Sequence, residues 1–257
     1  MLTLIAESKT MRDGQTDISP AMLKGHIPAG EQNASRIMER LENLSQPELM
    51  AETGLSSSLA VKLRQMLVDF PNKMLGQKAI EAFTGVVFKA LKYESLNGES
   101  RLLCEKDVRI ISSLYGLLCP DDIIKPYRLD FTSKAAPGGI TLNSFWKKDV
   151  TIQLVRTVID NEHKEILNLL PADAAKCIDW KIIKRFCKVW KADFVEITDG
   201  GKTRTPAANK LKTMRGDLLH RILSDGITDI SGLKDITSDN FIFEGTPVYP
   251  DHLQFIC

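Results

Sequence analysis

The chain has 257 residues, of which 43% are hydrophobic, and this length allows one large core or two modest ones. Its 34 Lys and Arg residues nearly balance its 33 Asp and Glu residues, so the formal net charge of +1 indicates neither a nucleic-acid binder nor an acidic protein. No apolar run approaches the ~20 residues of a membrane-spanning helix, and the N-terminus lacks a secretory signal pattern. We therefore expect one compact, cytosolic unit without a membrane partner, in which a basic surface arises only from local clustering.

Cysteine and histidine patterns do not indicate a metal or redox site. The five cysteines are odd in number and include no Cys-x-x-Cys pair, which is typical of reduced structural thiols. The four histidines are scattered, with no His-Glu-x-x-His motif. Tyr249, Asp251 and His252 come closest to a group of iron ligands, but we interpret them as part of a surface turn. We expect no metal and no cofactor, and no serine or cysteine nucleophile paired with histidine is identifiable.

The first elements are a strand, a loop and a helix. Met1 to Ala6 is a continuous apolar run that predicts a buried strand, and polar residues 7 to 10 follow where strand ends commonly present functional side chains. A segment with Gly and Pro from Asp13 to Gly30 predicts a loop. Apolar residues at helical spacing predict a helix from Ala34 to Leu44.

A helical hairpin is predicted within residues 34–70. Ser45 can cap a short helix with Pro47 in its first turn, Gly54 can end that helix, and Ser56 or Ser57 can cap the next one. This pattern is typical of a helix-hairpin-helix, whose second helix presents free backbone N–H groups to a phosphate without reading bases. A plain antiparallel helix pair is the alternative. The predicted DNA-binding residues are Gly54, Leu55, Ser56, Ser57, Ser58, Lys62 and Arg64.

Strands and helices alternate irregularly after residue 79, which predicts an α+β fold with a mixed sheet in a single domain spanning residues 1–257. We expect strands at 85–88 and 165–170, two strands within 186–197, helices at 107–118, 149–159 and 206–223, and a C-terminal hairpin over 241–256.

The segment from Ile111 to Phe131 combines apolar residues with a polar turn. Pro120 and Pro126 each fix φ and restrict the preceding residue, so the connection between them is rigid and ends on Tyr127 and Arg128. Such a loop suits anion recognition. The alternative is that Arg128 forms an ion pair with Asp121 or Asp122 and only holds the loop in place.

Several polar residues could form one basic cleft. On the helix at 206–223, Lys212 and Arg215 are i, i+3 neighbours at the edge of an apolar stripe, so their charged groups can converge on one anion, although ordinary ion pairs explain them as well. Tyr115, Tyr127 and Trp146 are candidate stacking surfaces for bases. The predicted cleft residues are Ser8, Lys9, Thr10, Tyr115, Arg128, Asn168, Lys212 and Arg215.

Motifs in the same order along nearly the whole chain resemble the YaaA family of bacterial peroxide stress proteins. Residues 114–129 are similar to the family's Leu-Tyr-Gly-x-Leu-x-Pro-x-Asp-x-Ile-x-Pro-Tyr-Arg-Leu signature. Shorter matches are Ser8-Lys9-Thr10, Ala82-Phe83-Thr84-Gly85, Phe145-Trp146, Asn168-Leu169, and Lys212 with Arg215-Gly216. The resemblance implies an α+β fold with an inserted helix-hairpin-helix, a positively charged cleft, binding to duplex or distorted DNA, and a role in limiting iron-driven oxidative damage.

The chain also departs from the family pattern. The family's Gly-Asp-Val-Tyr is replaced by Gly85-Val86-Val87-Phe88, which removes a carboxylate and a hydroxyl, and Ala172-Asp173-Ala174 stands where the family tends to have Asp-Glu-Tyr. The family's proline before Lys9 is absent, and Cys119 replaces an arginine. Acid–base chemistry needs a titratable group whereas phosphate binding needs mainly cations and N–H donors, so these losses affect catalysis more than binding.

We therefore expect a cytosolic bacterial protein of the peroxide stress response that binds DNA with weak sequence preference. One alternative is an enzyme acting on a nucleobase or nucleotide in the cleft, with Asp130 or Asp173 as its carboxylate. A second alternative is a regulatory protein that binds a protein partner and no ligand. The sequence leaves catalytic activity and oligomeric state open.

Overall fold

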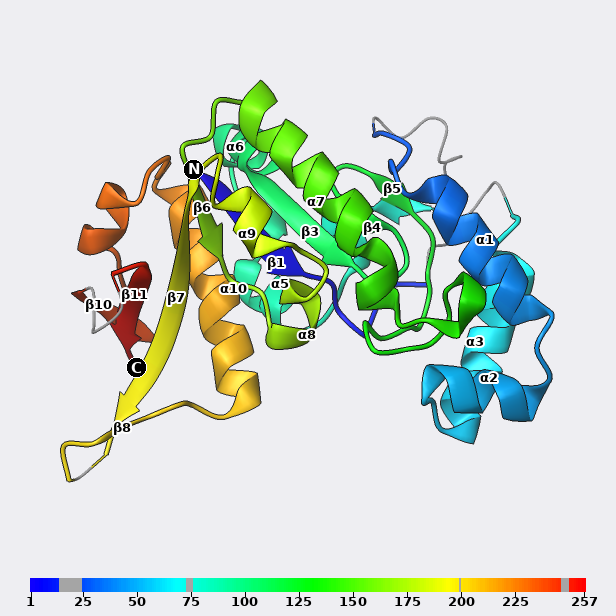
Figure 1. Cartoon of the computed structure of the whole chain (residues 1–257). Coiled ribbons are helices and arrows are strands. Elements are labelled where there is room, and N and C mark those ends of the chain that lie inside the picture. The colour runs from blue at the N-terminus through cyan, green and yellow to red at the C-terminus, as the bar shows by residue number, and fades with distance from the viewer. Residues whose placement is uncertain (14–24, 73–75, 199, 246–249) are drawn as a thin grey trace.

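A mixed β-sheet runs through the molecule (Figure 1). The computed structural model describes residues 1–13, 25–72, 76–198, 200–245 and 250–257. Within these residues the strand order is β4-β3-β1-β6-β7-β11-β10-β9, and β8 pairs with β7 outside this path. The strands are β1 (Leu2–Ala6), β3 (Val108–Ser112), β4 (Gly116–Leu118), β6 (Glu165–Asn168), β7 (Lys188–Ile197), β8 (Thr203–Arg204), β9 (Thr237–Ser238), β10 (Phe241–Gly245) and β11 (His252–Ile256). A separate two-stranded sheet pairs β2 (Gln77–Lys78) with β5 (Ile123–Ile124).

The middle of the large sheet is parallel. Strand β1 pairs in parallel with both β3 and β6, β6 pairs with β7, and β7 pairs with β11. The antiparallel pairs lie at the margins, where β4 pairs with β3 and β10 pairs with β11 and β9. Every residue of β1 is buried, as expected for a central strand covered on both faces. The sheet is thus mixed, as predicted, but its centre has the parallel arrangement of an α/β fold.

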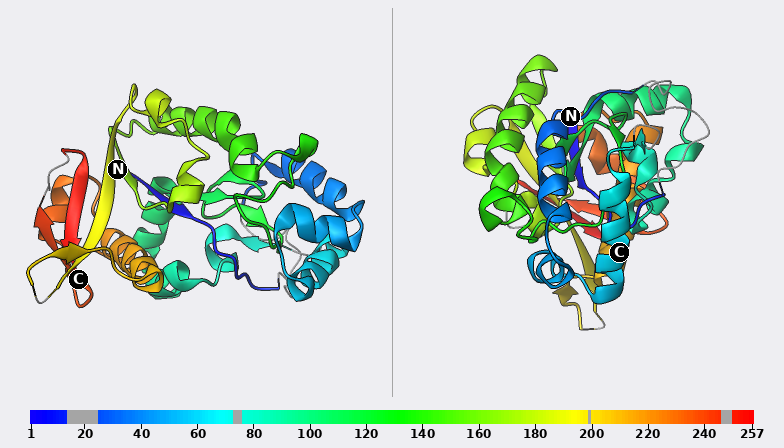
Figure 2. Two further views of the ribbon diagram at one scale, coloured as in Figure 1. Left: turned by 60° about the horizontal axis from the view of Figure 1, so that its bottom comes forward. Right: turned by 90° about the vertical axis from the view of Figure 1, so that its right-hand side faces the viewer.

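Helices cover both faces of this sheet. Figures 1 and 2 show α7 on one face and α5, α6 and α10 on the other. The helices are α1 (Glu31–Glu42), α2 (Gln46–Thr53), α3 (Ser57–Asp69), α4 (Ala79–Ala82), α5 (Val86–Leu91), α6 (Gly98–Asp107), α7 (Leu142–Asp160), α8 (Ala172–Ala175), α9 (Trp180–Ile183) and α10 (Ala208–Ser224). Short 3-10 turns lie at Tyr93–Ser95, Pro137–Gly139 and Ser231–Asp235. Among the residues that the structure describes, no helix combines the length and apolar character needed to cross a membrane.

Helices α1, α2 and α3 lie together at one end of the molecule (Figure 2). Helix α2 begins as predicted, because the Glu48 carboxylate accepts hydrogen bonds from the Ser45 N–H at 2.8 Å and from the Ser45 hydroxyl at 2.6 Å. It ends at Gly54, whose φ of 69° is in the left-handed region. Ser56 occupies the N-cap position of α3, but its hydroxyl does not cap the helix.

Three predicted elements are wrong. Residues 107–118 were expected to form a helix, but they form the end of α6 and a β-hairpin of β3 and β4 that turns at Gly116, whose φ is 78°. Both faces of these strands are buried, so their apolar run lacks a period of two and is compatible with a helix. Residues 85–88 belong to the start of helix α5, where packing against α10 overrides the strand preference of Val86 and Val87. Residues 188–197 form the single strand β7 and not two strands.

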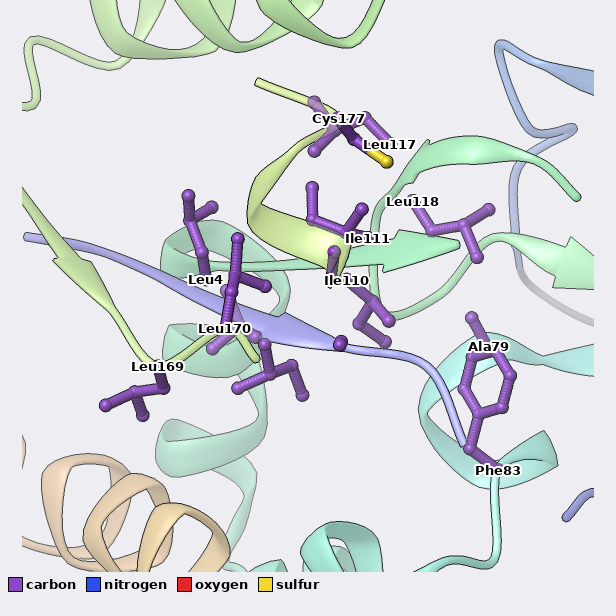
Figure 3. Packing of buried hydrophobic residues seen from close by; sticks show 14 of the residues in the cluster. Leu4, Ala79, Phe83, Ile110, Ile111, Leu117, Leu118, Leu169, Leu170 and Cys177 are labelled. Atoms are coloured by element: carbon purple, nitrogen blue, oxygen red, sulfur yellow. The ribbon is translucent and has the colours of Figure 1, made fainter. Parts of the chain in front are cut away.

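The remaining long elements agree with the sequence. Strands β1 and β6, helices α1, α7 and α10, and the C-terminal hairpin of β10 and β11 occur where they were predicted. In the core, Ile111 and Leu117 of the β3–β4 hairpin lie near Cys177 (Figure 3). Burial raises the pKa of the Cys177 and Cys104 thiols to about 12 each, as expected of structural thiols that stay protonated.

Candidate functional site at the carboxyl edge of the sheet

The carboxyl ends of three neighbouring parallel strands carry polar residues. Strand β3 ends at Ser112 and β6 ends at Asn168, and β1, which lies between them, leads directly into Glu7. The Glu7 N–H extends the pairing of β1 with β3 by donating to the Ile111 carbonyl oxygen at 2.9 Å. Because these strands run in the same direction, their ends form one polar edge of the sheet, which we call the strand edge.

The chain leaves this edge in two opposite directions. The connection from β1 to β3 passes through α5 and α6 on one face of the sheet, whereas the connection from β6 to β7 passes through α8 and α9 on the side of α7 (Figure 1). Such a reversal between adjacent parallel strands is a topological switch point, and ligands of open α/β sheets bind in the crevice beyond the strand ends there. Glu7 therefore lies at a position that suits a ligand site.

One oxygen of the Glu7 carboxyl group is held by the fold. Its Oε2 accepts a hydrogen bond from the backbone N–H of Ser113 at 2.8 Å and another from the hydroxyl of Tyr127. The Tyr127 hydroxyl also lies 2.7 Å from the Ser112 hydroxyl, which in turn accepts the N–H of Tyr115 at 3.0 Å. The other carboxyl oxygen, Oε1, accepts neither of these hydrogen bonds, and Glu7 as a residue is partly buried.

Burial determines the charge of this carboxyl group. Desolvation raises the pKa of Glu7 from 4.5 to about 7, although hydrogen bonds from Ser113, Tyr127 and Ser112 oppose the rise. Burial and the nearby Glu7 also hold the pKa of Tyr127 well above 10, so this phenol stays a donor. Near neutral pH, Glu7 therefore occupies both its protonated and its ionised form.

Two cations, Lys9 and Arg128, contact the segment that follows β1 and Glu7 in the chain. The Lys9 ammonium forms an ion pair with the Asp130 carboxylate, and the Arg128 guanidinium donates to the backbone oxygen of Lys9. The Lys9 side chain remains 58% exposed despite this pair. The Ser8 and Thr10 hydroxyls lie 3.1 Å apart beside it. The structure thus brings together Ser8, Lys9, Thr10 and Arg128 of the predicted cleft, together with the carboxylate Asp130.

Two glycines extend this surface to the late helix. Gly85 packs so closely on Ser8 that a Cβ at position 85 would overlap the Ser8 side chain. Gly216 of α10 lies against the carbonyl oxygen of Val87 in the same way. Helix α5, which begins after Gly85, therefore connects the strand edge to α10, which carries Arg215.

Lys212 and Arg215 have different surroundings. Lys212 is exposed, whereas Arg215 is partly buried, and desolvation lowers its pKa while Asp193 of β7 opposes that shift. Asp193 also pairs with Lys191 at 2.8 Å and with His252. In the described chain no contact joins this pair to Lys9 or Arg128, so the single converged cleft remains a prediction.

The three rings named as possible stacking surfaces lie in the core, which is the commoner place for a single aromatic ring. Tyr115 and Trp146 are fully buried and Tyr127 is 3% exposed, so their rings belong to the core. The Trp146 indole donates to the Ser113 carbonyl oxygen at 2.8 Å, and the Tyr115 hydroxyl accepts the N–H of Lys125 at 3.1 Å. Tyr115 therefore supports the strand edge from beneath and is not a cleft residue.

Asn168 is held by its own loop. Its Oδ1 accepts the N–H of Leu170 at 2.9 Å, which fixes the turn after β6. Among the described residues, no hydrogen bond joins its amide to Lys9 or Arg128. Its predicted role in reading a base stays a prediction.

Most predicted DNA-binding residues are exposed where α2 meets α3. Gly54, Ser56, Ser57, Ser58 and Lys62 are exposed, and Leu55 is partly buried. Arg64 is different, because its guanidinium donates to the carbonyl oxygens of Glu42 at 2.9 Å and Leu44 at 2.7 Å. Arg64 therefore caps the C-terminal end of α1, and this structural role explains it without a DNA contact.

In the rigid turn before Tyr127, the predicted alternative of an ion pair between Arg128 and Asp121 or Asp122 does not occur. Asp121 pairs with His26 at 3.0 Å and Asp122 accepts the N–H of Cys119 at 2.8 Å, so neither carboxylate holds Arg128. His26, Asp121 and Asp122 offer ligand atoms within 4.8 Å of one another, which the sequence did not indicate.

Two residues of the other candidate metal group, Asp251 and His252, lie 3.9 Å apart, and each also has another partner. Asp251 pairs with Lys184 at 2.9 Å and His252 pairs with Asp193, while Tyr249 lies outside the described residues.

The strand edge also contains residues that were not among the predicted cleft residues, although Glu7 was noted with the polar residues that follow the first strand. Glu7, Ser112, Ser113 and the Tyr127 hydroxyl form its hydrogen-bonded centre. A carboxylate directly after a buried strand was the available signal for Glu7. Nothing in the sequence placed Ser112 and Tyr127 beside it.

Fold and site together define a mixed α/β protein with a polar, titratable strand edge and a helical hairpin at one end. A family model described as Peroxide stress protein YaaA matches residues 1–246, so the chain belongs to the YaaA peroxide stress family. A UPF0246 protein of Parabacteroides distasonis is 30% identical over 258 residues, which cover 100% of this chain and 99% of that protein. One of Desulforapulum autotrophicum is 30% identical and covers 95% of both chains, and one of Rickettsia felis is 28% identical and covers 98% of this chain and 96% of its own length.

Proposed function

We propose that this cytosolic bacterial protein binds the sugar-phosphate backbone of duplex or distorted DNA, with weak sequence preference, as its part in the peroxide stress response. The observation that carries the proposal is the free N-terminal end of α3. The backbone N–H groups of Ser57 and Ser58 donate to no acceptor in the described chain, and no acidic residue occupies this first turn. Free N–H groups and the helix dipole favour a phosphate at such a position.

The start of the neighbouring helix α2 does not offer the same site. There the Glu48 carboxylate occupies the first turn and already accepts the Ser45 N–H, so a phosphate would meet a negative charge. At α3 the cation Lys62 is exposed one turn further on. The hairpin therefore presents one helix end that suits an anion.

The hairpin is connected to the strand edge. The Ser133 hydroxyl donates to the Thr53 carbonyl oxygen at 3.2 Å and accepts the N–H of Asp130 at 3.1 Å. The carbonyl oxygen of Glu52 also accepts the N–H of Lys134 at 2.8 Å. These bonds fix the hairpin turn close to the Lys9–Asp130 pair, so one DNA backbone can contact both. Limiting iron-driven damage would then follow from shielding of the bound DNA.

A matched pair of substitutions tests the hairpin. Ser58→Glu places a carboxylate at the second position of α3, which repels phosphate but favours the helix dipole, so lost binding does not arise from unfolding. We expect weaker binding of a 20-bp duplex by about the same factor for every sequence. Ser144→Glu, in the first turn of α7, makes the same chemical change elsewhere and should bind like the unchanged protein.

The salt dependence identifies the contacts. Each lost phosphate contact should flatten the slope of log Kd against log salt by roughly 0.9, and we expect this for Lys62→Ala but not for the exposed Lys148→Ala on α7. Fluorescence anisotropy across a salt series measures both values. Identical slopes for Lys62→Ala and the unchanged protein would exclude the hairpin as the contact, and no binding at low salt would refute the proposal.

A second candidate function is an enzyme that acts on a nucleobase or nucleotide. It is favoured by Glu7, because a carboxyl group with a pKa of about 7 at a switch point is suited to general acid–base catalysis. The unpaired Asp173 that the sequence offered for this role lies exposed on the short helix α8. Asp130 is engaged by Lys9. Mass spectrometry of oligonucleotides after incubation with the protein tests for turnover.

A further inference from the structure

We propose that the strand edge is a proton-coupled ligand site, in which the protonated Glu7 donates a hydrogen bond from Oε1 to an acceptor atom of a nucleobase in a nucleotide or a DNA strand. This inference rests on the proposed binding of DNA and adds the residue that meets the base. The acceptor is a ring nitrogen or a carbonyl oxygen. The proton comes from solvent when Glu7 is ionised before binding.

The two carboxyl oxygens of Glu7 differ in their hydrogen bonds to the protein. Oε2 accepts hydrogen bonds from the Ser113 N–H and the Tyr127 hydroxyl, so the carboxyl group has a fixed orientation. Oε1 accepts none of the hydrogen bonds that the described chain makes to this carboxyl group, and Glu7 as a residue is only partly buried. A ligand beyond the end of β1 therefore meets Oε1 and not Oε2. Tyr127 acts on the ligand through Glu7 and is a positioning residue.

No cation neutralises Glu7 in the described structure. The nearest basic residues are otherwise engaged, since Lys9 pairs with Asp130 and Arg128 donates to the Lys9 carbonyl oxygen. Burial therefore acts without compensation by a positive charge and keeps the pKa of Glu7 near 7. A ligand that displaces water from Oε1 and brings a phosphate nearby raises this pKa further, so binding takes up a proton.

The other groups around Glu7 do not titrate in the same range. The pKa of Tyr127 is held well above 10, and burial together with the nearby Glu7 raises the pKa of the Cys177 thiol to about 12. The hydroxyls of Ser112 and Ser113 do not ionise. Any proton uptake between pH 7 and 9 that depends on the strand edge is thus assigned to Glu7.

The phosphate of such a ligand has donors beside it. Lys9 is exposed, Ser8 and Thr10 present hydroxyls, and Arg128 lies at the same strand end. These residue types bind phosphate without selecting a base, whereas Glu7 interacts with a base atom. This division of roles suits a nucleotide and not a ligand that is only an anion.

The experiment compares the pH dependence of binding in the full chain and in Glu7→Gln. A glutamine amide keeps an oxygen for Ser113 and Tyr127 and presents a permanent N–H donor where the protonated carboxyl would be. The three probes are a single DNA strand of about 12 nucleotides, the matching duplex, and deoxynucleoside 5′-monophosphates. We expect the affinity of the unchanged protein for a probe to fall by up to about tenfold per pH unit above pH 7. Glu7→Gln should show no such fall and should bind more tightly than the unchanged protein at pH 8.5.

The control is Glu31→Gln. Burial also raises the pKa of Glu31, but this residue is on α1 and interacts with Lys125 and Tyr115 and not with Glu7, so its variant should follow the unchanged protein. Whichever probe shows the proton-coupled fall identifies the source of the base. Equal pH dependence in Glu7→Gln and the unchanged protein, with binding intact, would overturn this inference and leave DNA binding by the hairpin standing. Absence of binding to all three probes would overturn both.

Discussion

The raised pKa of Glu7 predicts a measurable loss of stability at neutral pH. The folded chain holds the proton of Glu7 up to about pH 7, whereas the unfolded chain releases it near the ordinary value of 4.5. Between these values the unfolded state binds fewer protons, so the free energy of unfolding falls as pH rises from about 4.5 through 7. Replacing Glu7 by glutamine removes this dependence because the amide does not ionise.

The magnitude follows from the size of the pKa shift. A rise from 4.5 to about 7 corresponds to at most about 3 kcal/mol at pH 8, because each pKa unit contributes about 1.4 kcal/mol. Because Glu7 as a residue is only partly buried, solvent screens part of this cost, and we expect Glu7→Gln to exceed the unchanged protein by roughly 1–3 kcal/mol at pH 8. Well below pH 4.5, where Glu7 is protonated in both states, the two proteins should have nearly equal stability.

Urea unfolding of both proteins at a series of pH values tests this. Other groups also respond to pH: burial raises the pKa of Asp122 to about 6, which acts in the same direction, and lowers the pKa of His163, which destabilises the fold in acid. Both groups are present in the two proteins, so the difference between them isolates Glu7. If the difference stayed constant from pH 4.5 to 8, or if Glu7→Gln were the less stable protein at pH 8, the assignment of a buried, unpaired carboxyl group would be refuted.

Two further predictions concern the packing that supports the site. Gly216→Ala should lower the free energy of unfolding by roughly 1–3 kcal/mol, because its Cβ would overlap the Val87 carbonyl oxygen; Gly98→Ala, which meets open space, is the control in the same urea titration. Arg64→Met should cost roughly 1–2 kcal/mol, because carbonyl oxygens at the end of α1 lose their donor, while the salt slope of DNA binding stays unchanged. A flatter salt slope in Arg64→Met would instead return Arg64 to the DNA contact.

Helix-capping residues and the spacing of apolar residues correctly predicted several helices. Ser45, Pro47 and Gly54 define α2 in the sequence, and the structure uses each of them as expected. The apolar stripe of α10 likewise predicted a helix, and Met214, Leu218 and Ile222 are buried on it. These elements depend on neighbours within a few residues, so one sequence is enough to locate them.

The prediction for residues 107–118, which form the hairpin of β3 and β4, failed because it depended on distant parts of the chain. The hairpin residues are buried on both faces of the strands, so the sequence lacks the alternation of apolar and polar residues that identifies a strand. Packing between distant segments also determines the helical conformation of α5. Its Val86 and Val87 favour a strand by local preference but lie in a helix against α10. Such information is absent from a short window of sequence.

The strand edge shows why residue identity alone located only part of the site. Ser8, Lys9, Thr10 and Arg128 were predicted individually, but their meeting depends on contacts across more than a hundred residues, as in the bond from Arg128 to Lys9. Tyr127 was named only as a possible stacking ring, and the sequence does not show what its hydroxyl contacts. The fold supplies that partner in Glu7, and this changes Tyr127 from a ligand contact to a residue that fixes the carboxyl group.

Two of the positions at which the chain departs from the family pattern, Val86 and Phe88, lie near the strand edge. Val86 begins α5 directly after Gly85, which packs on Ser8, so the carboxylate that the family pattern has at this position would stand close to the strand edge. Phe88 is buried with its ring centroid 5.1 Å from that of Phe83, so the lost hydroxyl would lie in the aromatic cluster beneath the edge. Glu7 is consequently a carboxyl group of this edge that the substitution at position 86 leaves in place. A chain that had lost every proton-exchanging group there could only bind, whereas this one retains at the edge a carboxyl group with a pKa of about 7.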